Sequence, residues 1–390
     1  MRISSAAGRS PLLFALGIWL LASCSAPDRD REITEAIETV ADESTTDTRL
    51  EIFAIDATRS GSRVSLTGDV GQVEWAESVI DRLEALGLQV ENQIRVLPDS
   101  SIGDQVAGIV TVSVANLRRH PAHSAELVTQ ALMGTRMTLL RKEGGWYLVQ
   151  GPDRYLGWLE GAVMSLKSAD ELVSWELQPQ VIFTVPAGTV WSDASDSASV
   201  VCDVVVGDTL VNAGKDGDSW RVQLPDGREG ILPAAGVSPL PEWRESRQLT
   251  GESVELTARR FLGVPYLWGG TSAKGFDCSG FSKTVFALNG FQLLRDADQQ
   301  ARQGEPVDLD PGFGELKRGD LLFFGRKASE TVPERITHVA IYLQNGDYIH
   351  ATPGFVQINS LDPDSPIYSE GNANRLLRAR RMIPTRTTTF

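Results

Sequence analysis

The fold of the last third of this chain is decided by Phe276-Asp277-Cys278-Ser279-Gly280-Phe281. Apolar residues follow Cys278 at helical spacing, among them Val285 and Phe286. Asp277 stands immediately before this run, where an N-cap residue belongs. The pattern predicts a largely buried helix that begins at Cys278.

A cysteine in the first turn of a helix can act as a nucleophile. The positive end of the helix dipole favours the thiolate, which is the reactive form. The free backbone N–H groups of a first turn can also stabilise an oxyanion. We therefore interpret Cys278 as the nucleophile of a catalytic segment.

Two of the four histidines in the chain, His338 and His350, flank a predicted β-hairpin in the same segment. A two-residue Asn-Gly turn would place them on opposite faces of the sheet. A three-residue turn at 344–346 pairs residue 343 with residue 347 and makes the two histidines diagonal neighbours on one face. We predict this second register, because only it lets one imidazole orient the other.

Residues 105–240 hold two copies of one pattern with a period of 73 residues. Short strands, regular turns and a tryptophan in each copy predict two small β-barrels. Glu126 and Tyr155 of the first copy are replaced by Ser199 and Arg228 in the second. Because the second copy does without them, Glu126 and Tyr155 are candidates for function. The alternative is that both are ordinary surface residues.

Other candidates for chemistry are weaker. Cys202 lies in a valine-rich strand of the second copy and is predicted to be a small buried hydrophobe. His120 and His123 precede Glu126, but a catalytic zinc site needs a third protein ligand. We therefore predict no metal and no cofactor.

The N-terminus carries the features of an export signal. Arg2 and Arg9 precede an apolar run over residues 11–21, which is too short to span a bilayer permanently. The run ends in Leu21-Ala22-Ser23-Cys24, which resembles a bacterial lipobox. Residues 1–24 are thus predicted to be a lipoprotein signal peptide with its lipidation site at Cys24. The alternative is a plain signal peptide.

Lipidation would place the protein in the cell envelope, on the outer membrane facing the periplasm if the cell has two membranes. Residues 25–48 are polar and acidic and are predicted to be a tether, with a short helix around residues 33–40 left open. A β-β-α-β unit follows over residues 49–98 and resembles the BON-type domains of envelope proteins. A formal charge of −14 argues against a nucleic-acid partner.

Four motifs together resemble the NlpC-type family of cell-wall cysteine peptidases over residues 250–385. They are Pro265-Tyr266-Leu267-Trp268-Gly269-Gly270, Gly275-Phe276-Asp277-Cys278-Ser279-Gly280, His338-Val339-Ala340-Ile341-Tyr342 and Ile349-His350-Ala351. The resemblance implies a papain-like α+β core with Cys278 as nucleophile and His338 as general base. It further implies that His350 orients His338 and that Tyr266 supports the tetrahedral intermediate.

The layout is similar to the γ-D-glutamyl-L-diamino-acid endopeptidases that act on muropeptides. This similarity implies that Glu126, Tyr155, Asp277 and Ser279 bind the free amine of an N-terminal L-alanine. The implied reaction is hydrolysis of the γ-D-Glu–diamino acid bond in L-Ala-γ-D-Glu-diamino acid peptides. Alternatives are a hydrolase of intact peptidoglycan, a non-catalytic wall-binding lipoprotein, and an acyltransferase on the same core.

The predicted fold class is a multidomain α+β chain. Its papain-like NlpC-type catalytic domain follows two small SH3-like β-barrels and a small β-β-α-β (BON-like) domain. The predicted divisions after the tether are 49–98, 105–168, 177–240 and 249–390.

Overall fold

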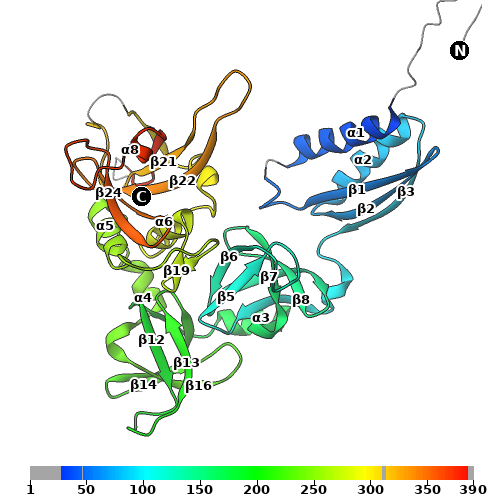
Figure 1. Ribbon diagram of the computed structural model, residues 1–390. Helices are drawn as coiled ribbons and strands as arrows, with labels where there is room; N and C mark the ends of the chain where they lie inside the picture. Colours follow the sequence, from blue (N-terminus) through cyan, green and yellow to red (C-terminus); the bar gives the residue numbers. More distant parts are fainter. Residues whose placement is uncertain (1–27, 46, 310–312, 385–390) are drawn as a thin grey trace, which may run out of the picture.

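The computed structural model describes residues 28–45, 47–309 and 313–384. The predicted signal peptide and lipidation site at Cys24 lie outside these residues. Figure 1 shows four sheet-containing bodies arranged along the chain, with the first antiparallel sheet between the N-terminal unit and the C-terminal body. Over the part of the chain that the structure describes, no helix has the length and apolar character to cross a membrane.

An α+β unit opens the described chain (Figure 1). Its first two strands are antiparallel and its third is parallel to the second, as the predicted β-β-α-β order requires. Two helices share one apolar core with this sheet. The elements are α1 (Arg29–Ser44), β1 (Phe53–Ser60), β2 (Arg63–Val70), α2 (Val73–Ala85) and β3 (Gln89–Val96).

Within the tether predicted over residues 25–48, the helix left open around residues 33–40 is present and extends over residues 29–44 as α1, which is docked rather than solvated. Ile33, Ile37 and Val40 share one face of this helix, and Ile33 and Val40 are buried against the core of the unit. The acidic residues occupy the other faces. The acidic composition indicated a solvated segment. The apolar residues on one face are nevertheless enough to dock the helix against the core.

Two seven-stranded antiparallel sheets follow, and they correspond strand for strand. The orders β6-β5-β9-β8-β7-β4-β10 and β13-β12-β16-β15-β14-β11-β17 are the same when the strands of each copy are counted from its start. The sequence duplication is thus a structural duplication.

The first copy contains β4 (Gln105–Val110), β5 (Val114–Arg118), β6 (Leu127–Leu132), β7 (Arg136–Glu143), β8 (Trp146–Gln150), β9 (Leu156–Glu160) and β10 (Met164–Ser168). After α3 (Ala169–Glu176), the second contains β11 (Gln180–Phe183), β12 (Ala187–Trp191), β13 (Val200–Val205), β14 (Thr209–Asp216), β15 (Ser219–Gln223), β16 (Glu229–Pro233) and β17 (Val237–Pro239).

The C-terminal body packs helices against a six-stranded sheet of order β20-β25-β21-β22-β23-β24. A buried cluster from α5, the turn after it, α6 and the central strands forms its core, and it includes the fully buried Phe261, Phe281 and Phe323. The elements are α4 (Leu240–Glu245), α5 (Gly251–Arg259), β18 (Thr271–Ser272), β19 (Gly275–Phe276), α6 (Cys278–Ala287), α7 (Ala297–Gln300), β20 (Glu305–Val307), β21 (Leu321–Arg326), β22 (Arg335–Tyr342), β23 (Asp347–Ala351), β24 (Val356–Ser360), α8 (Glu370–Ala373) and β25 (Leu376–Arg381).

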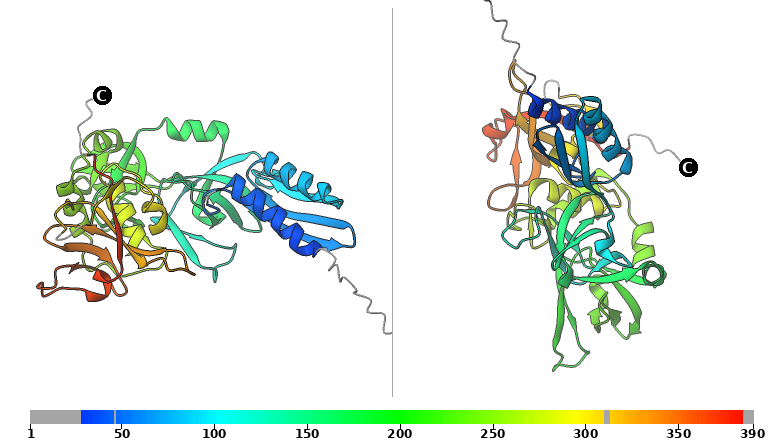
Figure 2. Two further views of the ribbon diagram at one scale, coloured as in Figure 1. Left: turned by 90° about the horizontal axis from the view of Figure 1, so that it is seen from above. Right: turned by 90° about the vertical axis from the view of Figure 1, so that its right-hand side faces the viewer.

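The first antiparallel sheet is docked closely on the C-terminal body, as two views agree (Figures 1 and 2). Lys283 of α6 pairs with Asp153 at 3.1 Å, and both side chains are at most 15% exposed. Gly269 has φ +78°, and a Cβ there would lie 2.4 Å from the carbonyl oxygen of Leu127. Only glycine fits this contact, so the loop before Cys278 is shaped by the neighbouring sheet.

Candidate active site

Cys278 is the first residue of α6, as predicted, and the helix is capped by its neighbour. The Asp277 carboxylate accepts hydrogen bonds from the backbone N–H of Gly280 at 2.7 Å and of Gly269 at 2.9 Å. The helix starts here because this side chain satisfies an N–H that the helix cannot. The thiol is thereby fixed at the positive end of a buried helix.

The hairpin that carries the histidines adopts the predicted register. Ile341 pairs with Ile349, and the N–H of Leu343 donates to the carbonyl of Asp347 at 2.8 Å across the turn at 344–346. Both histidines therefore lie on the same face of the sheet. His338 Nε2 lies 2.7 Å from His350 Nδ1.

Asn359, which the sequence analysis missed, fixes the proton positions in this pair. Its amide nitrogen donates to the carbonyl of Ile367 at 3.2 Å, so its Oδ1 faces His350 Nε2, 3.0 Å away, and can only accept. His350 Nε2 then carries a proton and its Nδ1 accepts one from His338 Nε2. This leaves His338 Nδ1 as the unprotonated nitrogen. Its position on β24, diagonal to His350, is the signal that would have found it.

Cys278 and His338 line one cavity of about 590 Å³, together with Tyr266. Burial raises the pKa of the Cys278 thiol to about 12, while Arg295 acts in the opposite direction. Burial also lowers the pKa of His338 to about 3, with His350 and Arg375 adding to the effect. These shifts favour a neutral thiol and a neutral imidazole before substrate binds.

Burial likewise raises the pKa of the Tyr266 phenol to about 12, which keeps this group protonated and able to donate a hydrogen bond.

Glu126 and Tyr155, the two residues that distinguish the first repeat from the second, both line the same cavity. Tyr155 is buried, and its hydroxyl donates to Asp296 Oδ2 at 2.9 Å. Glu126 Oε1 accepts from Trp268 Nε1 at 3.0 Å, and its Oε2 accepts from Arg119 at 2.6 Å. The contact with Arg119 holds the pKa of Glu126 below its ordinary value.

The other two predicted amine ligands have a strong internal partner. Arg295, only 1% exposed, binds both oxygens of Asp277 at 3.1 and 2.6 Å and the hydroxyl of Ser279 at 3.0 Å. Its Nε donates to Thr129 of the first sheet. Asp277 and Ser279 border the cavity, but the carboxylate of Asp277 is already neutralised, which the sequence analysis did not foresee.

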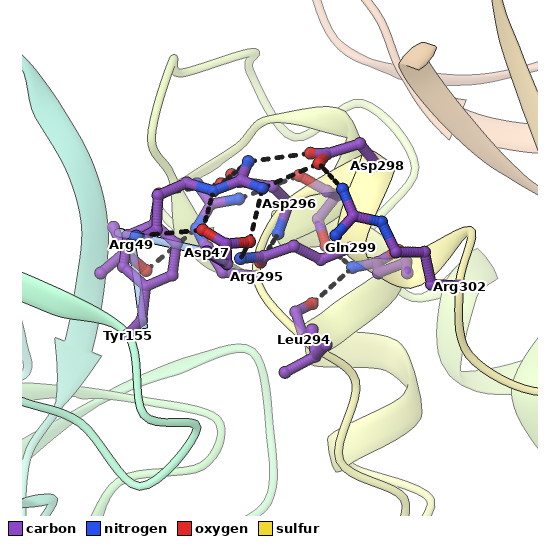
Figure 3. Close-up of polar contacts among 12 residues, drawn as sticks. Asp47, Arg49, Tyr155, Leu294, Arg295, Asp296, Asp298, Gln299 and Arg302 are labelled. Atoms are coloured by element: carbon purple, nitrogen blue, oxygen red, sulfur yellow. Dashed lines mark hydrogen bonds and ion pairs between the residues drawn. The ribbon is translucent and has the colours of Figure 1, made fainter. Parts of the chain in front are cut away.

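Acidic groups next to the cavity come instead from the start of α7. Figure 3 shows Asp296 and Asp298 contacting Arg49, from the segment before β1, and Tyr155 in the same network. The charged stretch Arg295-Asp296-Ala297-Asp298 is visible in the sequence. Its place at the cavity follows only from the structure, which brings residues 47–49 into contact with it.

The remaining candidates lie apart from this site. His123 packs edge-to-face on Trp146 with ring centroids 5.1 Å apart. Cys202 is half-buried in β13, and burial raises the pKa of its thiol to about 11. Residues 28–45, 47–309 and 313–384 contain no cluster of three or more His, Cys, Asp or Glu side chains arranged to hold a metal ion.

Comparisons with known proteins agree with this architecture. The sequence model of the NlpC/P60 family matches residues 263–377, and that of the bacterial dipeptidyl-peptidase Sh3 domain matches residues 117–162. A gamma-D-glutamyl-L-lysine dipeptidyl-peptidase of Bacillus cereus is 30% identical over 66% of this chain and 76% of its own length. Dipeptidyl-peptidase 6 of Lysinibacillus sphaericus is 30% identical over 69% of this chain and 96% of its own.

A solved NlpC/P60 family protein from Bacillus cereus has 28% sequence identity to this chain. It superposes with a TM-score of 0.60 over 71% of this chain and 100% of its own. Sequence identity, length coverage and fold therefore indicate the same family. The two family models match parts of both the C-terminal body and the first antiparallel sheet. The chain belongs to the NlpC/P60 family of cell-wall peptidases and carries an SH3-like domain in front of its catalytic domain.

Proposed function

We propose that this protein is a cysteine peptidase that hydrolyses the γ-D-Glu–diamino acid bond of muropeptides with a free N-terminal L-alanine. One observation carries the proposal. The thiol of α6, the imidazole of β22 and the distinguishing residues Glu126 and Tyr155 of the first repeat line one cavity. In such a site the C-terminal body can cleave a short peptide, and the first repeat can select that peptide by its N-terminal group.

In the proposed mechanism, Cys278 Sγ attacks the γ-carbonyl carbon and its proton passes to His338 Nδ1. His350 and Asn359 hold the imidazole in the required tautomer at 2.7 and 3.0 Å. The C–N bond breaks and the diamino acid leaves with the proton from His338. Water then hydrolyses the thioester to release L-Ala-γ-D-Glu and restore the thiol. Tyr266 is proposed to donate to the oxyanion.

The pH dependence of kcat tests the role assigned to His338. A general base works only when it is unprotonated, and burial holds the pKa of His338 below 6.5. Activity should therefore persist as the pH falls below 6.5 and disappear only when the lowered pKa is reached. The measurement is kcat at saturating substrate between about pH 4 and pH 8. A half-maximal rate at pH 6.5 or above would contradict the assignment.

The amine subsite is proposed at the end of the cavity formed by the first sheet. Glu126 and Asp296 supply carboxylates there, and the Tyr155 hydroxyl is fixed between the two bodies by Asp296. An ammonium group can pair with these carboxylates, whereas an acylated nitrogen carries no charge. Residues of the first repeat, Glu126 and Tyr155 among them, line this end of the cavity. These observations support selection for free N-termini.

Substrate selectivity tests the subsite directly. We expect L-Ala-γ-D-Glu-diamino acid to be cleaved at least about tenfold more efficiently than its N-acetyl form, because one charged contact contributes about 1.5–3 kcal/mol. Glu126→Gln should raise KM for the free-amine peptide and leave kcat nearly unchanged. Ser199→Ala, the equivalent position in the second repeat, is the matched control. Equal cleavage of both peptides would favour a hydrolase of intact peptidoglycan instead.

We also propose that the protein is exported and lipid-anchored through Cys24, and that the N-terminal unit is BON-like. The second seven-stranded sheet is proposed to be a further SH3-like barrel, because its strand order equals that of the first. Metabolic labelling with a fatty acid should mark the wild-type protein and not Cys24→Ala. A protein that remains unlabelled would leave a plain signal peptide as the explanation.

A further inference from the structure

Arg49 lies outside both segments matched by the family comparisons, yet it reaches the edge of the active-site cavity. All five of its guanidinium N–H groups bind carboxylates (Figure 3). Nε and Nη2 donate to Asp47 at 2.8 and 2.7 Å. Nη1 donates to Asp296 and Asp298 at 2.8 Å each, and Nη2 also donates to Asp298 at 2.8 Å.

The segment that carries Arg49 is held from both sides. The backbone carbonyl of Arg49 accepts a hydrogen bond from the N–H of Leu156 in the first sheet at 2.9 Å. Asp47, with a side chain 8% exposed, accepts from Gln299 of α7 at 2.7 Å. Arg49 is thus a fixed bridge between the N-terminal unit, the first sheet and the C-terminal body.

Arg49 orders the carboxylates at this end of the cavity. Its one guanidinium binds the three carboxylates of Asp47, Asp296 and Asp298. Arg49 Nη1 and the Tyr155 hydroxyl meet at the same oxygen, Asp296 Oδ2. The guanidinium therefore fixes the orientation of the carboxylate and, through it, that of the phenol.

We propose that Arg49 is a positioning residue of the amine subsite, which makes the segment before β1 part of the active site. The inference rests on the proposed function, since it assigns a cause to the placement of Asp296 and Tyr155. It also gives the N-terminal unit a role beyond that of a spacer, because the unit delivers and anchors this segment.

Electrostatics give the role a distinctive signature. Burial raises the pKa of Asp296, and the neighbouring Asp298 acts in the same direction. Arg295 and Arg49 oppose this, as does the hydrogen bond from Tyr155. Asp47 from the N-terminal segment, together with Arg119 and Glu126 from the first repeat, also faces this end. From the C-terminal body, Asp277 lines the cavity while paired with Arg295. Loss of Arg49 raises the pKa of Asp296 further, so amine binding should fail at a higher pH.

The test compares Arg49→Gln with Arg302→Gln in the full-length protein. Arg302 also pairs with Asp298, at 3.0 Å, but is 61% exposed and does not contact Asp296. For the free-amine tripeptide, we expect Arg49→Gln to raise KM about tenfold at neutral pH with a small change in kcat. The acidic limb of kcat/KM should move to higher pH. Arg302→Gln should change neither quantity.

Arg49→Lys separates positioning from charge alone, because lysine keeps the charge but cannot bind three carboxylates in the same geometry. We expect it to recover the pH limb but only part of the affinity. An unchanged KM and pH limb in a folded Arg49→Gln protein would overturn the inference, and a lower KM would show that Arg49 competes with the substrate. If wild type showed no preference for a free amine, the proposed function itself would fail, before any variant was compared.

Discussion

Cys278→Ala is expected to abolish hydrolysis of L-Ala-γ-D-Glu-diamino acid peptides, with kcat falling about 10⁴-fold or more. The thiol is the only group of the site that can form the thioester, and alanine leaves His338 with no proton to accept. Because the side chain opens onto the cavity at the first turn of α6, its loss should alter folding little. Product release from the defined tripeptide, followed by mass spectrometry, is the measurement.

Cys202→Ala is the matched control, since Cys202 is the other free cysteine among the described residues and lies in the second repeat. Its activity should equal that of wild type. Full activity in Cys278→Ala would exclude the covalent mechanism. It would favour a wall-binding lipoprotein whose apparent activity came from a contaminant.

Arg295→Met should lower the free energy of unfolding of the C-terminal body by about 3–5 kcal/mol. Methionine fills a similar volume but leaves the Asp277 carboxylate, 10% exposed, without its bidentate partner. The Nε contact to Thr129 is lost as well, so docking of the first sheet should weaken. Urea unfolding followed by tryptophan fluorescence measures the change.

A double variant distinguishes a lost ion pair from a packing defect. Asp277→Asn combined with Arg295→Met removes both charges, and we expect it to be more stable than Arg295→Met alone. Arg302→Met, on an exposed side chain, should change stability by less than about 0.5 kcal/mol. A loss below about 1 kcal/mol in Arg295→Met would falsify the structural role assigned to this pair.

Local sequence patterns were sufficient where a single element decides the outcome. The start of α6 at Cys278 followed from its cap and its apolar spacing, and the hairpin register followed from turn length. Comparison of the two repeats singled out Glu126 and Tyr155, and both contact the C-terminal body. The helix start and the hairpin register are confirmed because each depends on residues within one helix or one hairpin, whereas the role of Glu126 and Tyr155 stays a prediction.

Long-range pairings were not readable in the same way. Nothing in the local sequence indicates that Arg295 neutralises Asp277, or that Arg49 meets Asp296 across 247 residues of chain. The acidic composition of residues 25–48 left a helix open but did not indicate its docking, because the docking surface belongs to α2 and the sheet. Charge partners depend on which bodies touch, and this is set by packing between them.

The site is assembled from stretches that are far apart in the chain, and this has a consequence for folding. Residues near 49, 126–155, 277–298 and 338–359 must all be in place before the cavity is complete. Non-local contacts slow folding, because the entropy of closing long loops must be overcome first. A partly folded chain can therefore hold the thiol and the local His338–His350–Asn359 contacts without the residues of the N-terminal segment and the first sheet that complete the cavity. Appearance of the proposed peptidase activity should thus report the completion of folding in this protein.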